Sequence, residues 1–321
     1  MRILLAGTPT VAVPSLMALA ESGHELVGAI TRPDRPAGRG RHLAASAVGL
    51  AAAELSLPVL KPDHPCEPEF QEELRALRPD AVAAVAYGAL LPESALSIPT
   101  HGWINLHFSL LPAWRGAAPV QRAIWAGDEI TGATTFQIVK ELDAGPVFGR
   151  LTYAVPGRAT AGEVLETLAA DGAKLLVSTL DLIEAGEARL EPQGVDGISY
   201  APKMTAEDAQ VNWAAPAQAV DRQIRACTPA PGAWTTFRDQ RVKIGPISDA
   251  GPLPEVPKWV ATPDAEPGTL LRLKHAVLVK TGSAWAALGE VAPAGKSWMA
   301  AAAWARGVRI DQEVATERMG E

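Results

Sequence analysis

The chain has 321 residues, of which 48% are hydrophobic and 20% are charged. These proportions exclude an intrinsically disordered protein and are ordinary for a folded chain with a large core, and the length favours two domains. The net charge of −7 argues against a general polyanion-binding protein. The charge is uneven, because residues 1–202 carry 15 basic and 23 acidic residues whereas residues 203–321 carry 14 and 13. Contact with nucleic acid would therefore need local basic patches.

Cysteine and histidine usage indicates neither a disulfide framework nor a metal site. Cys66 and Cys227 lie far apart and form no CxxC pair. The six histidines show no spacing typical of zinc ligands, so we expect no metal. The short apolar N-terminus is interrupted by Gly7-Thr-Pro-Thr10, and no later apolar run is long enough to span a membrane. We expect a cytoplasmic protein without membrane contact.

Strands and helices alternate along the N-terminal part of the chain. The apolar run Arg2–Ala6 predicts a strand, a helix is expected from about Pro14 to Glu21, and Leu26–Thr31 predicts a second strand. This β-α-β opening is typical of a parallel sheet with a right-handed crossover. Its turn contains only Gly7 rather than a GxGxxG motif, which disfavours a dinucleotide-binding site. The alternation continues with helices expected at 44–55, 67–77, 119–127 and 160–185 and strands expected at 58–60, 80–86, 134–139 and 147–155, with a central strand starting at Trp103.

A basic loop follows the second strand. Residues Arg32–His42 contain four arginines and one aspartate, and two prolines and two glycines predict irregular structure. From the residues alone three interpretations stay open: a solvated loop, a phosphate-binding lid and a nucleic-acid contact. A nucleoside triphosphate is disfavoured, because the loop lacks the GK[ST] ending of a Walker A motif.

The pattern changes to β structure in the C-terminal part. Residues 187–212 show little periodicity, and Ala217–Ala226 predicts a short amphipathic helix. Five short strands, expected at 233–237, 241–247, 268–273, 276–280 and 284–291, then indicate a small OB-like barrel with residues 251–268 as a long loop inside it. We therefore predict an α/β fold with a Rossmann-like, mostly parallel sheet domain (1–190), a connector (191–208) and an OB-like β-barrel domain (209–321).

The stretch Trp103–Gly116 contains polar side chains that could take part in binding or catalysis. Asn105 and His107 are two apart on the expected strand, so their side chains share a face. Ser109-Leu-Leu-Pro112 ends the strand, since proline has no N–H for a sheet. Polar groups at the carboxyl end of a strand mark the place where open α/β sheets bind ligands. We expect the loops after three strands to converge there and to bring Tyr87-Gly88 and Asp143 to the same crevice.

An amide, an imidazole and a carboxylate in one crevice suit acyl transfer without a covalent enzyme intermediate. Asn105 would donate to the oxygen of a carbonyl that becomes tetrahedral, where one fixed donor lowers the barrier by about 3–4 kcal/mol. His107 would add a second donor or move a proton. Asp143 would orient the imidazole and favour its charged form, or accept the proton of an attacking amine directly or through a water. Each residue taken alone is more often structural, and Ser109 shows no sign of activation as a nucleophile.

At these residues the sequence resembles the folate-dependent formyltransferases. The resemblance is carried by Asn105-x-His107, by Ser109-Leu-Leu-Pro112 with Trp114-Arg-Gly116, and by Asp143. It covers most of the chain and is strongest over residues 1–150. The sequence is most similar to the branch of the family that acts on methionyl-tRNA, through the motifs Ala6-Gly-Thr-Pro9, Pro33–Gly40 and Gly116–Arg122.

Family membership implies a catalytic N-terminal domain and an OB-like domain that helps to hold tRNA. The implied reaction transfers formyl from 10-formyltetrahydrofolate to the α-amino group of methionine on initiator tRNA. The implied catalytic residues are Asn105, His107 and Asp143. The implied folate-binding residues are Ser109, Leu110, Leu111, Pro112, Tyr87 and Gly88. The implied tRNA-binding residues are Arg35, Arg39 and Arg41, in a cationic loop that suits salt-dependent phosphate contacts.

Some positions depart from the family pattern, and rival functions stay open. Phe108 stands where a small residue or proline is common, Ala113 where a basic residue is common, and Thr10-Val11 where Asp-Phe is usual.

One rival is a formyltransferase that acts on a sugar nucleotide or another small amine. Another is a non-catalytic RNA-binding protein with an OB module, and a nicotinamide enzyme is a more distant alternative. We expect a monomer.

Overall fold

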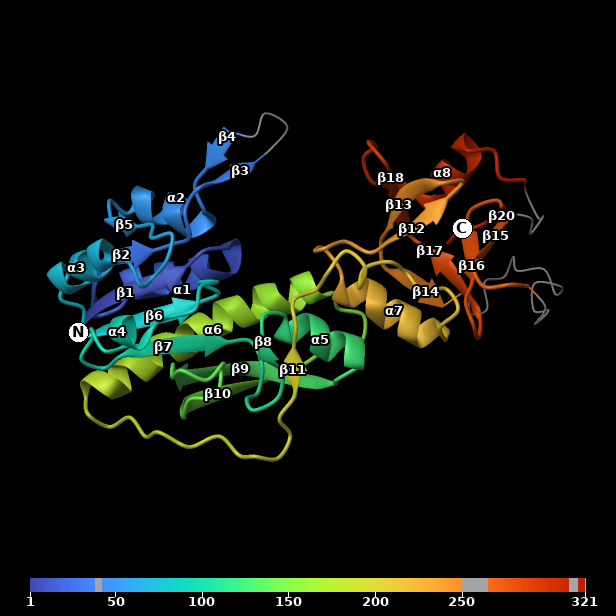
Figure 1. Ribbon diagram of the computed structural model, residues 1–321. Helices are drawn as coiled ribbons and strands as arrows, with labels where there is room; N and C mark the ends of the chain where they lie inside the picture. Colours follow the sequence, from blue (N-terminus) through green and yellow to red (C-terminus); the bar gives the residue numbers. More distant parts are fainter. Residues whose placement is uncertain (38–41, 250–264, 312–316, 321) are drawn as a thin grey trace. The chain divides into compact units, whose positions relative to one another are not determined.

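The computed structural model describes residues 1–37, 42–249, 265–311 and 317–320 (Figure 1). Their contacts divide the chain into two compact units. The first unit contains Met1–Pro119, Ile130–Ala154 and Leu165–Pro202, and the second contains Val120–Glu129, Val155–Val164 and Lys203–Glu321. The predicted domain boundaries at residues 190 and 208 refer to domains that fold independently. A division by contacts does not test independent folding, so these boundaries stay a prediction.

Across the described residues, a seven-stranded sheet forms the framework of the first unit, in the order β10-β9-β7-β6-β1-β2-β5. β5, β2, β1, β6 and β7 run parallel, whereas β9 is antiparallel to β7 and β10 is antiparallel to β9. The prediction of a mostly parallel sheet is therefore confirmed. The strands span Arg2–Gly7 (β1), Glu25–Ile30 (β2), Val59–Leu60 (β5), Ala81–Val85 (β6), Trp103–His107 (β7), Ile130–Gln137 (β9) and Val147–Ala154 (β10).

Helices pack on both faces of this sheet. On one face, Phe70 and Leu74 of α3 share a buried cluster with Trp103 of β7. On the other, a methyl group at Gly172 of α6 would lie 3.1 Å from the Leu106 side chain, so the helix backbone approaches β7 closely. The helices of the first unit span Val13–Ala20 (α1, after the 3-10 turn Thr10–Ala12), Ala47–Glu54 (α2), Pro68–Ala76 (α3), Glu93–Leu96 (α4) and, from Leu165 onward, Ala161–Glu184 (α6). Pro119–Ala126 (α5) belongs to the second unit from Val120 onward.

Side-chain caps set where two of these helices begin. Thr160 donates through its N–H and its Oγ1 to Glu163 Oε2 at 2.8 Å each, and the Glu163 N–H donates back to Thr160 Oγ1 at 3.4 Å. This capping box starts α6 after the predicted cap residue. α2 begins later than predicted, because Ser46 Oγ accepts the Gly49 N–H at 3.0 Å and caps the helix there.

The prediction of an irregular loop over residues 32–42 is wrong in part. Arg35–Ala37 (β3) and His42–Ala44 (β4) pair as an antiparallel hairpin, which projects from the sheet in Figure 1. Pro36 is tolerated because each strand of a two-stranded ribbon keeps one edge that needs no N–H donor. Arg35 is exposed on β3, whereas Arg39 and Arg41 lie outside the described residues.

The second unit combines antiparallel strands with α7 (Ala217–Ala226) and α8 (Ala301–Gly307). α7 has its predicted bounds. We predicted a small OB-like β-barrel domain here, and the predicted β domain is confirmed as a C-terminal domain of antiparallel strands. One sheet has the order β12-β13-β18-β19, and another has the order β14-β17-β16-β15-β20. The strands span Trp234–Phe237 (β12), Gln240–Ile244 (β13), Ile247–Asp249 (β14), Thr269–Arg272 (β15), Val277–Lys280 (β16), Trp285–Leu288 (β17), Glu290–Pro293 (β18), Met299–Ala300 (β19) and Glu317–Arg318 (β20).

Two strands that the sequence predicts as continuous, 241–247 and 284–291, are each divided between the two sheets. Gly245-Pro246 separates β13 from β14, because proline has no N–H to continue the ladder. Gly289 separates β17 from β18, and a methyl group there would lie 3.0 Å from the Pro246 carbonyl oxygen. The two breaks therefore lie side by side, at a corner where strands change sheet. The long loop predicted for 251–268 falls mostly outside the described residues.

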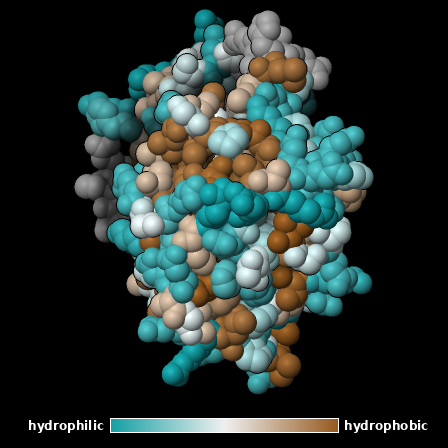
Figure 2. Space-filling view, turned by 90° about the vertical axis from the view of Figure 1, so that its left-hand side faces the viewer, coloured by the Kyte–Doolittle hydropathy of each residue, from teal (hydrophilic) through white to brown (hydrophobic). Residues whose placement is uncertain are grey.

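The surface mixes apolar and polar side chains. Figure 2 shows hydrophobic residues (brown) gathered in part of one face, with hydrophilic residues (teal) around them. Leu43, Leu90 and Val195 are 73%, 86% and 84% exposed. Exposed apolar side chains of this kind are normal on a folded domain. Among the described residues, no helix has both the length and the hydrophobicity needed to cross a membrane.

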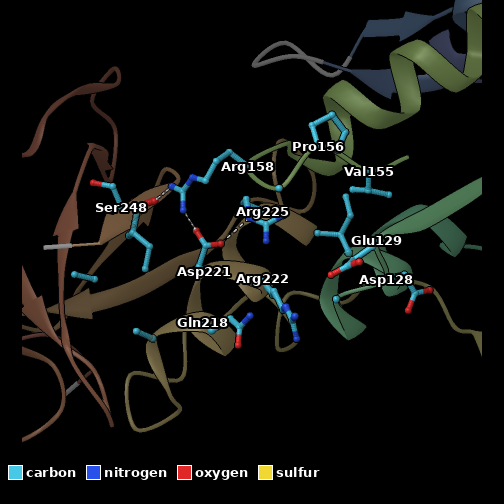
Figure 3. A pocket seen from close by; sticks show the side chains of 16 residues that line it. Asp128, Glu129, Val155, Pro156, Arg158, Gln218, Asp221, Arg222, Arg225 and Ser248 are labelled. Atoms are coloured by element: carbon cyan, nitrogen blue, oxygen red, sulfur yellow. Dashed lines mark hydrogen bonds and ion pairs between the residues drawn. The ribbon is translucent and has the colours of Figure 1, made fainter. Parts of the chain in front are cut away.

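A partly buried ion-pair network stabilises the second unit. Asp221 on α7 accepts hydrogen bonds from Arg225 Nε at 2.7 Å and from Arg158 Nη1 at 3.0 Å. Arg225 also donates to the Ala159 carbonyl at 3.0 Å, and Arg158 donates to the Ile247 carbonyl. These side chains line a hollow of about 440 Å³ (Figure 3). The network therefore ties the residues before α6 to α7 and β14.

We expect Asp221→Ala to destabilise the protein by about 3 kcal/mol, because it leaves the buried Arg225 guanidinium without its carboxylate. The matched control is Arg158→Ala, which removes the other partner of Asp221. Since the Arg158 side chain is 59% exposed, its loss should cost less than about 1 kcal/mol. Urea unfolding followed by circular dichroism measures both values, and equal losses would show that burial of the Arg225 pair is unimportant.

Candidate active site

Asn105 and His107 project from β7, which lies between β6 and β9. Asn105 pairs with Ala84 on β6 and with Phe136 on β9, so it sits inside the sheet rather than at its edge. Because side chains alternate along a strand, Asn105 and His107 share a face. Asn105 is partly exposed, and none of the described residues hydrogen-bonds its carboxamide. An uncommitted amide donor therefore stands beside the imidazole.

His107 is 6% exposed and is held by a backbone carbonyl. Its Nε2 lies 2.9 Å from the Trp114 carbonyl oxygen, which can only accept, so Nε2 carries the proton. The other ring nitrogen, Nδ1, lies 3.7 Å from Asp143 Oδ2. The ring of Phe136 packs edge-on against the imidazole, with centroids 6.4 Å apart. The structure thus brings His107 and Asp143 together, with Nδ1 as the nitrogen that faces the carboxylate.

Burial controls the charge of His107. It lowers the pKa of the imidazole below the ordinary value of 6.5, because the charged ring would lose its hydration. The Asp143 carboxylate and the hydrogen bond to Trp114 act in the opposite direction. Burial has the larger effect, so the ring is neutral at pH 7 and has a lone pair on Nδ1.

Asp143 is positioned by a backbone N–H from the loop after β7. The Gly116 N–H donates to Asp143 Oδ2 at 2.8 Å. Gly116 lies on the short strand β8 (Arg115–Gly116), which pairs with β11 (Tyr200–Ala201). Its φ is +125°, and a methyl group there would lie 2.7 Å from the Ala201 carbonyl oxygen. The position therefore requires glycine.

We predicted that Asp143 comes close to His107 because the loops after three strands converge at one edge of the sheet. For the loop after β9 this reason is wrong. Since β9 is antiparallel to β7, its carboxyl end lies beside Ile104, away from His107. The loop 138–146 instead returns toward His107, and Gln193 holds it there. The Gln193 Nε2 donates to the carbonyls of Asp143 and Gly145 at 2.8 Å each, and its Oε1 accepts from Arg115 Nη2 at 2.6 Å.

The loop Ser109–Pro112 is braced from within. Ser109 is fully buried, and its hydroxyl donates to the Ala113 carbonyl at 2.6 Å. Thr134 Oγ1 donates to the Ser109 carbonyl at 2.6 Å and accepts the Leu111 N–H at 3.2 Å. Leu111 packs against Phe136, whereas Leu110 and Pro112 keep part of their surface exposed. The apolar surface of this loop therefore comes from Leu110 and Pro112, and Ser109 stabilises the turn.

Tyr87 and Gly88 follow β6, whose carboxyl end lies at the same edge as that of β7. The Tyr87 side chain is 5% exposed and packs against Trp103, with ring centroids 6.5 Å apart. Burial raises the pKa of its phenol to about 12, so it stays neutral. The Tyr87 carbonyl accepts from Thr8 Oγ1 at 2.9 Å. Since the Tyr87 ring belongs to the core, Gly88 is the member of this pair that is free of core packing.

Three groups in the site were not predicted from the sequence. The Trp114 carbonyl and the Gly116 N–H are backbone groups, and their direction depends on φ, which is +60° at Trp114. Gln193 lies in the aperiodic segment that was predicted as a connector. Of these three groups, only the Gly116 N–H had a signal in the sequence, namely the glycine itself in the motif Trp114-Arg-Gly116. Of the positions that depart from the family pattern, Phe108 is 6% exposed and lies in the core.

Comparison with known proteins identifies the family. A model described as "Formyl transferase" matches residues 1–180, and one described as "Formyl transferase, C-terminal domain" matches residues 203–309. A methionyl-tRNA formyltransferase of a Nocardioides strain is 59% identical over 98% of this chain and 97% of its own. The chain belongs to the methionyl-tRNA formyltransferase family. The predicted resemblance to the formyltransferases is thereby confirmed.

Another member of the methionyl-tRNA formyltransferase family, from Thermobifida fusca, is 56% identical over the full length of both chains. Solved structures share the fold at lower identity. HypX from Aquifex aeolicus has a TM-score of 0.67 at 18% identity, over 98% of this chain and 50% of its own. A sugar 3N-formyl transferase has a TM-score of 0.66 at 14% identity, over 92% of this chain and 99% of its own. These two structures support the predicted fold alone.

We expect Gly116→Ala to reduce formyl transfer strongly, because the methyl group would displace β8 from Ala201 and so move Asp143 away from His107. Backbone strain at this positive φ should also destabilise the protein by about 1–3 kcal/mol. Gly194→Ala is the matched control, since a methyl group there meets nothing within 4 Å. Initial rates and urea midpoints measure both effects. A Gly116→Ala enzyme as active as Gly194→Ala would show that this contact does not position Asp143.

The lowered pKa of His107 predicts a pH-dependent loss of stability. Below pH 6.5 the unfolded chain binds a proton on this histidine that the folded chain does not, so stability falls as the pH falls through this range to the folded pKa. His107→Gln removes this contribution. The difference in unfolding free energy between pH 7.5 and pH 5.5, measured in urea, should therefore be smaller for His107→Gln than for the wild type. Identical differences would contradict a buried neutral imidazole.

Proposed function

We propose that this protein transfers the formyl group of 10-formyltetrahydrofolate to the α-amino group of methionine esterified to initiator tRNA. The observation that carries the proposal is the His107–Asp143 pair at 3.7 Å beside the uncommitted Asn105 carboxamide. The proposal is further supported by 59% identity, over nearly the whole chain, to a relative named methionyl-tRNA formyltransferase. We also propose that the protein acts as a cytoplasmic monomer.

The first role is stabilisation of negative charge. When the amine attacks the formyl carbon, a C–N bond forms and the formyl oxygen becomes negative. Asn105 donates an N–H to this oxygen, and a fixed donor of this kind lowers the barrier by about 3–4 kcal/mol. No other described residue binds the Asn105 carboxamide, so it needs no rearrangement to make this bond.

The second role is proton transfer. The attacking amine must lose a proton, and the departing nitrogen of the folate must gain one when its bond to the formyl carbon breaks. His107 Nδ1 is the ring nitrogen with a lone pair, because Nε2 donates to Trp114. In our proposal Nδ1 accepts the proton, directly or through a water, and Asp143 stabilises the imidazolium until the proton passes to the leaving nitrogen.

The folate and the tRNA need separate binding residues. The residues present fit a folate, because Leu110 and Pro112 offer partly exposed apolar surface beside the buried Leu111 and the braced Ser109. We propose that this loop, with the backbone at Tyr87 and Gly88, lines the folate site. We further propose that Arg35 on β3 contacts tRNA together with Arg39 and Arg41.

The rival functions have weaker support. A sugar-nucleotide formyltransferase shares the fold at 14% identity, whereas the relatives named for methionyl-tRNA share more than half of the residues. A non-catalytic RNA-binding protein has no need of a carboxylate held beside a buried imidazole. Neither rival is therefore favoured.

We expect the wild-type protein to formylate methionyl initiator tRNA and Asn105→Ala to lower kcat about 100- to 1000-fold, since it loses the oxyanion donor. His107→Ala should show a loss of similar size. Acid gels that separate formylated from free methionyl-tRNA provide the measurement. His64→Ala changes an exposed histidine remote in sequence from the site and should keep wild-type kcat.

The same assay is repeated with amino-sugar nucleotides as acceptors. A protein that formylates such a nucleotide and leaves methionyl initiator tRNA unchanged would refute the proposed acceptor. A wild-type protein that formylates neither acceptor would refute the proposed reaction.

A further inference from the structure

The segment 191–201, in the last part of the first unit, contacts both pieces of chain that carry the catalytic pair. At its start, Glu191 and Val147 exchange backbone hydrogen bonds of 2.7 and 2.9 Å, which fixes the chain just after the Asp143 loop. At its end, β11 pairs with β8, the strand that follows Trp114 (Figure 1). The segment is therefore placed to set how these two pieces lie relative to each other.

Gln193 is the residue of this segment that reaches the Asp143 loop. It is partly buried, whereas the residues on both sides of it are exposed. Its Nε2 donates to the carbonyls of Asp143 and Gly145 at 2.8 Å each, and its Oε1 accepts from Arg115 Nε at 3.1 Å and Nη2 at 2.6 Å. Since carbonyls only accept and a guanidinium only donates, the reversed carboxamide would lose all of these bonds. The Gln193 side chain thus has one orientation.

The backbone of Asp143 needs this support. Its φ is +48°, in the left-handed region, which costs a residue with a side chain about 1–2 kcal/mol. The direction of the carboxylate depends on this conformation, so a relaxed loop would turn it away from His107. Two hydrogen bonds that contribute about 1 kcal/mol each are enough to offset the strain. Gln193 supplies two, and one of them binds the carbonyl of the strained residue itself.

The hydrogen bond from Gly116 does not replace those from Gln193. The Gly116 N–H binds one oxygen of the Asp143 carboxylate, which fixes a distance but leaves the loop free to rotate about that contact. Gln193 binds the backbone of the same residue and so fixes the orientation. Arg115, next to Gly116 in the chain, holds the Gln193 carboxamide and connects the two contacts.

We propose that Gln193 is a positioning residue for formyl transfer, which holds the Asp143 backbone so that the carboxylate stays beside His107. Gln193 does not touch the reacting atoms and acts through Asp143. Arg115 acts one step further away, because it keeps the Gln193 N–H donors directed at the loop. The inference rests on the proposed function, in which Asp143 stabilises the imidazolium of His107.

Gln193→Leu tests the role in catalysis, because it removes both N–H donors, adds no charge and keeps a side chain of similar size. We expect kcat for methionyl initiator tRNA to fall about 100-fold, the loss that a displacement of about 1 Å can cause at a reacting group. KM for tRNA and for the folate should keep their wild-type values, because Gln193 lines neither proposed binding surface. Val195→Ala is the control from the same segment, since Val195 is 84% exposed, and it should keep wild-type kcat.

Gln193→Glu separates the two sides of the carboxamide. A glutamate still accepts from Arg115, and more strongly, but it has no N–H for the carbonyls of Asp143 and Gly145. We expect it to lose kcat as Gln193→Leu does. Circular dichroism and urea midpoints show whether each variant is folded, and Gln193→Glu carries the kinetic test if Gln193→Leu is not. A folded Gln193→Glu enzyme with wild-type kcat would mean that the contact with Arg115 is sufficient, which would overturn the inference.

The position of Asp143 can also be measured without the reaction. The Asp143 carboxylate raises the pKa of His107, so its displacement should lower this pKa further. The Trp114 carbonyl and the Phe136 ring, which also contact the imidazole, are retained in Gln193→Leu. NMR titration of the His107 ring, assigned with His107→Gln, gives the pKa. We expect a lower value in Gln193→Leu than in the wild type or in Val195→Ala, a shift that lost stability alone would not produce.

The outcomes distinguish this inference from the proposed function. If the wild type formylates methionyl initiator tRNA and Gln193→Leu keeps its kcat, the inference is overturned. An unchanged His107 pKa in Gln193→Leu overturns it as well, whatever the activity, because Asp143 has then not moved. If the wild type formylates no methionyl-tRNA and the His107 pKa falls in Gln193→Leu, the proposed function fails and the hold of Gln193 on Asp143 stands.

Discussion

The hydrogen bond from the Gly116 N–H to Asp143 Oδ2 is the constraint on which the candidate site depends. His107 belongs to a sheet strand, but Asp143 belongs to a loop that starts at the opposite end of that strand. The loop therefore needs outside support to return. Gly116 holds the carboxylate and Gln193 holds the backbone, and Arg115 beside Gly116 binds the same Gln193. One short segment after β7 thus supplies both the Trp114 carbonyl that binds His107 and the Gly116 N–H that binds Asp143.

This arrangement gives His107 two opposing influences. Burial lowers the pKa of the imidazole, and the nearby carboxylate raises it. A group used for proton transfer works best when it can both accept and release a proton near the working pH. A buried ring with no carboxylate would hold a proton too weakly, and an exposed ring against the same carboxylate would hold it too strongly. The distance of 3.7 Å, longer than a hydrogen bond, keeps the effect of Asp143 moderate.

The sequence predicts the regular elements well, because hydrophobic period and caps are local properties. β7, α6 and α7 follow from alternation, from the Thr160 cap and from an amphipathic pattern. The failures fall where tertiary structure decides. Pro36 and its neighbours form a hairpin, and Gly245-Pro246 divides a strand between two sheets. The same holds for the site. The sequence pointed to Asn105, His107 and Asp143 because they stand in recognisable motifs. It did not point to the Trp114 carbonyl or to Gln193, because their contacts depend on backbone direction and packing that no local pattern encodes. The assigned roles of the named residues stay predictions.

The net negative charge constrains how the proposed acceptor is recognised. An acidic chain gains little from general attraction to RNA, so the binding energy for an anionic ligand comes from a few local cations. One such group is expected around Arg35 in the first unit. A small group of cations favours the ligand that offers it the larger number of phosphates. A tRNA offers a continuous run of phosphates and an amino-sugar nucleotide does not, so in this proposal the choice of acceptor follows from phosphate contacts as well as from the chemistry beside His107.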